Sequence, residues 1–160
     1  MKLKAANPHT SRTIAFIDIE NLTSSSTPTL PQCQRIWSVV EKVIDPSKTP
    51  VVAACSHRAA KIASFAIPGA RWKWRSGPDG ADLALLEEID PDALAPRFSH
   101  VVIGSGDGIF AERAARLAVA GLTVTVVSRR RSLAKRLELA SGHVVFIDDD
   151  TIAEVSEDVA

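Results

Sequence analysis

Two carboxylates stand at the points where apolar runs of the sequence end. One run closes on Asp18, and a later run leads through small residues to Asp107. If these runs are neighbouring parallel strands, the two carboxylates meet at one edge of the sheet, where ligands of such sheets bind. Carboxylates that converge without a Lys or Arg between them repel one another unless a cation is present, and Mg²⁺ and Mn²⁺ prefer oxygen ligands. The pair therefore indicates a divalent-metal site, although a strand-end Asp can also serve only as a helix N-cap.

The elements that would position these residues follow an alternating order. Short apolar runs, each followed by turn residues, alternate with segments of helical spacing, which predicts βαβ units and a mostly parallel sheet. We therefore expect an α/β fold, a single three-layer domain with a mostly parallel central sheet. The expected strands are Thr13–Asp18, Val51–Cys55, Ala70–Arg75, His100–Ile103, Thr123–Val127 and Val144–Ile147, the last reaching Asp148. The expected helices are Pro31–Ile44, Ser56–Phe65, Ala81–Ile89, Phe110–Ala120 and Ser132–Ala140.

Composition limits the class of protein. A chain of 160 residues fits one domain, and 19 Lys and Arg balance 19 Asp and Glu, so no global field favours a polyanion. Cys33 and Cys55 lack metal-ligand spacing and give no disulfide framework. No apolar run approaches the roughly 20 residues of a membrane span. We expect a cytoplasmic protein without a membrane partner, with tails at 1–12 and 150–160 around a domain at 13–149; a homodimer is left open.

Three segments carry a more specific signal. They are Phe16–Leu22 (FIDIENL), Gly80–Leu85 (GADLAL) and Val102–Phe110 (VIGSGDGIF). Together they resemble the NYN domain family, relatives of the PIN-like ribonucleases. That family places an Asp with a nearby Asn after its first strand, an Asp entering a central helix, and a Ser-Gly-Asp-x-Asp-Phe turn after its fourth strand. The match runs in order from Thr13 to Asp148, so the resemblance implies a PIN-like, Rossmannoid fold.

The resemblance also implies a function, that of a divalent-metal-dependent nuclease, with RNA as the substrate. Asp18 and Asp107 would be the primary metal carboxylates and Asp82 the third, with Mg²⁺ or Mn²⁺ as the cofactor. Such a metal can activate water and stabilise the charge of phosphodiester cleavage. Asn21 would orient the substrate or a water, or would simply make a turn or cap at the end of the first strand.

One departure from the family leaves the activity open. Where the family commonly carries a second Asp in its glycine turn, this chain has Ile109. Either three carboxylates suffice for cleavage, or the protein is a catalytically weak RNA-binding or regulatory module.

Two other families share part of the pattern. A haloacid-dehalogenase-like phosphatase also has an Asp after its first strand and a Gly-Asp-Gly turn, but it would require Asp at position 20 and a carboxylate at position 111, where the chain has Glu20 and Ala111. A dinucleotide-binding turn fails because the small residue that it needs would fall at Ile109.

Two basic segments could bind a nucleic-acid backbone. In Arg71–Arg75 (RWKWR) the alternation places three cations, Arg75 among them, on one face of a strand and Trp72 and Trp74 on the other. An exposed Trp would allow base stacking. The alternative, which we favour, is an edge strand protected by its cations, with both Trp side chains buried under a helix.

The second basic segment follows a strand and leads into a helix, so it should lie on the same edge as the carboxylates. Cations there would collect phosphate groups, although a solvated charge run needs no function. The segment consists of Arg129, Arg130, Arg131 and Lys135.

Overall fold

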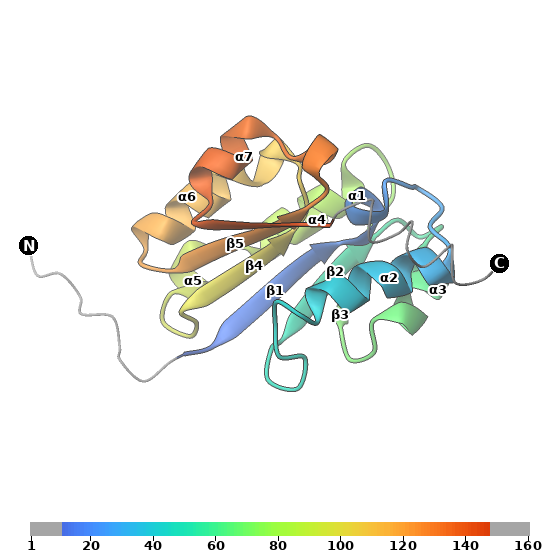
Figure 1. The fold of residues 1–160 in the computed structure, drawn as a ribbon, viewed down its shortest axis with the longest axis horizontal. Coiled ribbons are helices and arrows are strands. Elements are labelled where there is room, and N and C mark those ends of the chain that lie inside the picture. Colours follow the sequence, from blue (N-terminus) through green and yellow to red (C-terminus); the bar gives the residue numbers. More distant parts are fainter. Residues whose placement is uncertain (1–10, 148–160) are drawn as a thin grey trace, which may run out of the picture.

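The computed structural model describes residues 11–147, which form a six-stranded parallel sheet between two layers of helices (Figure 1). The predicted α/β fold with a parallel central sheet is confirmed. Asp148 and nearly all of both predicted tails lie outside the described residues, so the domain boundaries stay predictions. The strands are β1 (Thr13–Asp18), β2 (Val51–Cys55), β3 (Arg71–Trp74), β4 (His100–Gly104), β5 (Thr123–Ser128) and β6 (His143–Phe146). The helices are α1 (Ile19–Thr23), α2 (Leu30–Val40), α3 (Ala60–Ala66), α4 (Gly80–Glu88), α5 (Pro91–Leu94), α6 (Ala111–Val119) and α7 (Lys135–Ala140), with short 3₁₀ helices η1 (Gly108–Phe110) and η2 (Arg130–Ser132).

The strand order, β3-β2-β1-β4-β5-β6, creates a switch point in the middle of the sheet. From β1 the chain builds outward to β3, then crosses back to β4 on the other side of β1. Ile17 of β1 lies opposite Gly104 of β4, so Asp18, the last residue of β1, and Ser105, the first residue after β4, lie at the same edge of the sheet. The crevice between diverging connections at such a point is the usual ligand site of an open parallel sheet.

One helical layer, α1 to α3, covers one face of β1, β2 and β3. The α2 helix buries Cys33, Ile36, Trp37 and Val40, the i, i+3, i+4, i+7 spacing of an amphipathic helix. Its start is fixed by a capping box, in which Thr29 and Gln32 exchange side-chain-to-backbone hydrogen bonds. This layer therefore holds β1, and with it Asp18, in place.

The other layer, α4 to α7, covers the opposite face, and Figure 1 shows α6 and α7 across the sheet from α2 and α3. Its core joins Leu85 of α4, Phe110 of η1, Leu117 of α6 and Leu137 of α7 to the apolar side chains of the sheet. The crossover from β3 to β4 runs through α4, which brings Asp82 to the carboxyl edge of the sheet. Within residues 11–147 no helix combines the length and the apolar character needed to cross a bilayer.

The observed helices differ from the predicted ones at several points, and one of them is α3, which begins at Ala60 rather than Ser56. The α2 helix ends at Val40, and hydrogen-bonded turns continue to Ile44. The α7 helix begins at Lys135 rather than Ser132, because Ala134 N–H donates to Gly106 O and holds the preceding chain extended. The short helices α1 and α5 were not predicted, since four or five residues carry no visible periodicity.

Candidate metal centre

Asp18 ends β1 and is only 3% exposed. Its Oδ1 accepts a hydrogen bond from Asn21 N–H at 3.2 Å, so the carboxylate caps α1 and is held at the edge of the sheet. Burial is the main reason that the pKa of Asp18 is raised well above its ordinary value, and the neighbouring Asp82 carboxyl raises it further. A nearby cation would favour the ionised form that burial and the neighbouring carboxyl disfavour.

Three further carboxylates gather beside Asp18. Asp79, Asp82 and Asp107 each offer an oxygen, and these atoms all lie within 4.8 Å of one another. Asp82, in the first turn of α4, is 8% exposed, and its Oδ1 has no hydrogen-bond partner among the described residues. Burial raises the pKa of Asp82, and the charges of Asp107 and Asp79 add to the rise. Asp18 is not one of these three, but its carboxyl interacts directly with that of Asp82.

Asp107 caps η1, with Oδ1 accepting from Ile109 N–H at 2.9 Å. The capping bond uses one oxygen and leaves the other available to the cluster. Asp79 lies at the start of α4 with φ of 54°, a left-handed conformation in which Asp is tolerated better than most side chains. Within residues 11–147, no Lys or Arg forms an ion pair with any of the four carboxylates, so the acidic cluster (Asp18, Asp79, Asp82 and Asp107) lacks a countercharge of its own there.

Asn21 connects the two strand ends. Its side-chain Oδ1 accepts from Gly106 N–H at 2.9 Å, which ties α1 to the turn that carries Asp107. Gly106 has no room for a side chain, because a Cβ there would lie 2.4 Å from Ser128 Oγ and from Ser132 O. The turn is therefore clamped between the first strand and the segment that follows β5. Asn21 acts in this structure as a brace between segments rather than as a simple turn or cap of its own helix.

A cavity of about 210 Å³ opens beside the acidic cluster. Glu20, also in its wall, accepts a hydrogen bond from Ser56 N–H and so joins the ends of β1 and β2. Arg75 is the cation of this wall, and its Nη1 pairs with Glu87 Oε1 at 2.8 Å. The lining residues are Asp18, Glu20, Asn21, Ser56, Arg75, Gly77, Asp79, Gly80, Ala81 and Asp82.

The predicted basic segment lies at the same edge of the sheet, and its side chains differ in environment. Arg129 Nε donates to Leu22 O at 2.7 Å, which anchors that side chain to α1. The Arg130 guanidinium stacks over the Phe146 ring, 4.1 Å from its centroid. Lys135 pairs with Glu138 at 3.2 Å, and Arg131 is exposed. Arg131 and Lys135 are therefore placed to meet a ligand from solvent, whereas Arg129 also braces the fold.

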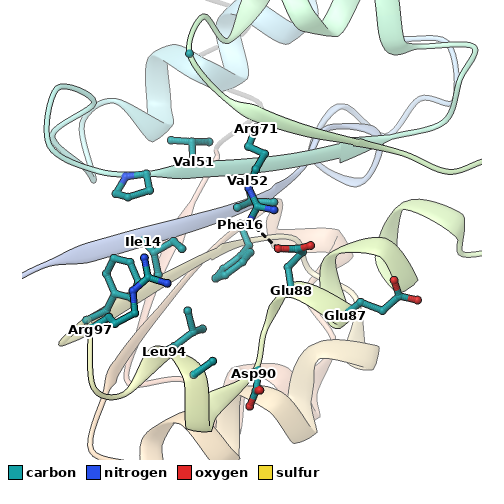
Figure 2. A pocket seen from close by; sticks show the side chains of 14 residues that line it. Ile14, Phe16, Val51, Val52, Arg71, Glu87, Glu88, Asp90, Leu94 and Arg97 are labelled. Carbon is teal, nitrogen blue, oxygen red and sulfur yellow. Dashed lines mark hydrogen bonds and ion pairs between the residues drawn. The ribbon is translucent and has the colours of Figure 1, made fainter.

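A larger cavity, of about 520 Å³, lies toward the amino ends of the strands (Figure 2). Ile14, Phe16 and Val52 form its apolar wall, and the ion pair between Arg71 and Glu88 stands at its rim. None of the four clustered carboxylates lines it. The clustered carboxylates thus lie away from this larger cavity.

Sequence reasoning did not single out Asp79 or Glu20. Asp79 lies in Pro78-Asp79-Gly80, which reads as an ordinary turn, and only the fold shows that its carboxylate reaches Asp82 and Asp107. An Asp three residues before Asp82 was the available signal. The donor set of the cluster, all carboxylate oxygens with one buried and unpartnered, fits a hard divalent cation.

Comparison with known proteins identifies a similar fold and a family. The crystal structure of a protein of unknown function from Vibrio parahaemolyticus has the same fold, with a TM-score of 0.59 at 19% identity over 94% of this chain and 98% of that one. No curated protein matches the chain significantly. The NYN domain matches residues 12–148, nearly the whole chain and all three segments that carry the resemblance. This chain belongs to the NYN domain family of the PIN-like nuclease superfamily.

Proposed function

We propose that the chain is a divalent-metal-dependent endoribonuclease whose acidic cluster holds Mg²⁺ or Mn²⁺. The observation that carries the proposal is Asp82 Oδ1, which is buried among like charges without a partner in the described part of the chain. A buried carboxylate oxygen costs free energy unless it is hydrogen-bonded or paired with a cation. A divalent cation would supply the missing partner, and Asp18, Asp79 and Asp107 would share its coordination.

The residues of the site have separate tasks in this proposal. When bound, the cation would lower the pKa of water and stabilise negative charge on the phosphate. Hydrolysis adds water across one P–O bond, so that the hydroxyl goes to phosphorus and the proton to the departing sugar oxygen. Asn21 keeps Asp107 in register with Asp18 through its bond to Gly106. Arg75, at the cavity wall, would attract the phosphate, and Arg131 and Lys135 would hold the flanking backbone.

The decisive experiment compares two substitutions of the same kind. Asp107→Asn keeps the N-cap, since Asn caps as well as Asp, but removes the charge. RNA cleavage in Mn²⁺ should fall on the order of 100-fold or more, while RNA binding is retained. Asp90→Asn is the matched control, because Asp90 caps α5 through the same contact, Oδ1 to Asp92 N–H at 3.0 Å, away from the cluster. Equal losses in both variants, or none in Asp107→Asn, would contradict the proposal.

A second candidate, an RNA-binding module without cleavage, is favoured by one observation. Ile109 packs against the apolar core between the sheet and the layer α4 to α7, at the position where the family commonly has an Asp. Wild-type protein that binds RNA but cleaves none with Mg²⁺ or Mn²⁺ would establish this reading. In that case Ile109→Asp should raise Mn²⁺ affinity, measured by calorimetry. Hydrolysis of a small phosphomonoester in place of RNA would instead identify a phosphatase.

A further inference from the structure

Two tryptophans form a stack on the edge strand of the sheet. The rings of Trp72 and Trp74 have centroids 5.0 Å apart and an angle of only 4° between their planes. Trp72 is partly buried against the apolar core between the sheet and the layer α1 to α3, whereas Trp74 is 39% exposed. The prediction that both would be buried under a helix was therefore wrong for Trp74. One face of its ring is covered by Trp72, and no other aromatic ring stacks on it among residues 11–147.

The stack ends beside the proposed metal centre. Trp74 is the last residue of β3, and Arg75, which follows it, lines the cavity next to the acidic cluster. Arg75 N–H donates to Cys55 O at 3.1 Å, so the end of β3 is held against the end of β2. Because successive strand residues point to opposite faces, Arg75 turns toward α4 and Trp74 toward the side of α3.

The next position on the Trp74 side of the strand is occupied by a small residue. Ser76 Oγ accepts from His57 N–H at 3.2 Å and lies 2.9 Å from His57 Nδ1, which keeps that hydroxyl close to the backbone. No large side chain of β3 therefore continues the stack toward the carboxyl edge. A planar group that arrives from the cavity could extend it.

We propose that Trp74 is a base-stacking platform, on which an unpaired nucleobase next to the bound phosphate continues the Trp72–Trp74 stack. This inference rests on the proposed function and adds to it a substrate class, single-stranded nucleic acid. A base within a duplex has its faces covered by neighbouring bases, so only an unpaired base offers one to the ring. Stacking is tolerant of sequence, because every base has an aromatic face.

A protein partner would be the other occupant of an exposed apolar ring. Phe65 on α3, 70% exposed, shows that apolar exposure is not confined to Trp74. The nucleobase is favoured because Trp74 directly precedes Arg75, a cation that lines the carboxylate cavity and could bind the phosphate of the same nucleotide chain. Phe65 has no such neighbour in the cavity wall, which makes it a matched control.

The test measures binding, with Ca²⁺ in place of Mg²⁺ or Mn²⁺ to suppress cleavage. A single-stranded ten-nucleotide RNA should quench the tryptophan emission of the wild type, and a blunt RNA duplex of the same length should quench it much less. Trp74→Ala should lose most of the quenching and weaken single-strand binding about tenfold. Trp74→Phe, which keeps a ring, should recover part of the affinity. Phe65→Ala should behave as wild type in both measurements.

Kinetics give an independent reading. In Mn²⁺, Trp74→Ala should raise KM for single-stranded RNA with little change in kcat, because the platform binds a base that is not itself reacting. Unchanged affinity and quenching in Trp74→Ala would overturn the platform while leaving the nuclease proposal intact. If Trp74→Ala loses self-association but still binds RNA as the wild type does, the ring belongs to a protein interface, and the platform proposal is overturned in that case too. Absence of RNA binding by the wild type would remove both proposals.

Discussion

The two ends of α4 differ in whether their carboxylates form ion pairs with cations of the described chain. At its first turn, Asp82 is buried among Asp18, Asp79 and Asp107 and forms no ion pair with a Lys or Arg of residues 11–147. At its last turn, Glu88 is paired with Arg71 at 2.6 Å and Lys73 at 2.9 Å. Glu87, beside it, pairs with Arg75 at 2.8 Å. One helix therefore holds an uncompensated acidic group and a compensated one.

Their pKa values show which effect controls each end. The helix dipole favours negative charge at the start of α4 and disfavours it at the end. Even so, the pKa of Asp82 is raised, mainly by burial, and that of Glu88 is lowered by its bonds to Lys73 and Arg71. Burial and close partners outweigh the dipole at both ends. Glu87 and Glu88 have their countercharge within the chain, and we infer that the acidic cluster takes its countercharge from a bound cation.

The largest expected effect is the response to a divalent cation. Mn²⁺ at about 100 times its Kd should stabilise the metal-free protein by about 2.7 kcal/mol, since a ligand that binds only the folded state shifts unfolding by mass action. Asp82→Asn should lose most of this increase, and Glu88→Gln, on the same helix, should keep it. Thermal unfolding in EDTA and in Mn²⁺ measures both. If stabilisation by Mn²⁺ survives in Asp82→Asn, or disappears in Glu88→Gln, the proposed difference between the two ends of α4 is contradicted.

The two ends should also respond to pH with opposite sign in EDTA. Raised pKa values mean that folded Asp18 and Asp82 hold protons more tightly than in the unfolded chain, so stability rises as pH falls from neutral toward their ordinary pKa of about 4. The lowered pKa of Glu88 means that its contribution is complete above about 4.3 and is lost below it. The free energy of unfolding, measured with denaturant, should first rise and then decline as the pH is lowered from neutral. Asp82→Asn should flatten the rise; a stability that only falls on acidification would refute the sign.

The smallest effect should come from the compensated end. Glu88→Gln should lower the free energy of unfolding by less than about 1 kcal/mol, because Arg71 and Lys73 are partly exposed and exposed ion pairs contribute little. The loss should shrink in about 1 M salt, where such pairs are screened. Urea unfolding at low and high salt provides the measurement. A loss of several kcal/mol that is independent of salt would mean that this end is buried as tightly as the other.

Much of the fold could be predicted because most strands are short apolar runs separated by turns, as in β2, where all five residues are buried. The positions of Asp18 and Asp107 could be predicted as well, since strand ends of a parallel sheet share an edge. Asp79 could not, because its part in the cluster depends on a left-handed backbone at the start of α4. As metal ligands, Asp18, Asp82 and Asp107 stay predictions.

Side-chain contacts between segments that are far apart in the sequence could not be predicted either. Arg129 was predicted to bind nucleic acid, and its bond to Leu22 O, across 107 residues of sequence, leaves no local pattern. The bridge from Asn21 to Gly106 is hidden in the same way. For Trp74, alternation along the strand predicts which face the ring takes, but its exposure depends on β3 being at the edge of the sheet, which only the strand order decides.

The pairing of β1 with β4 also has a consequence for when the site comes into being. Thr13 and His100 contact each other across 87 residues, so β1, which ends at Asp18, and β4, which leads to Asp107, cannot meet by any local step. Closing so long a loop is slow, and its entropy is lost before the contacts that reward it are made. A chain still emerging from the ribosome carries Asp18 on β1 long before β4 exists. Affinity for a cation should therefore arise late in synthesis, together with the completed sheet.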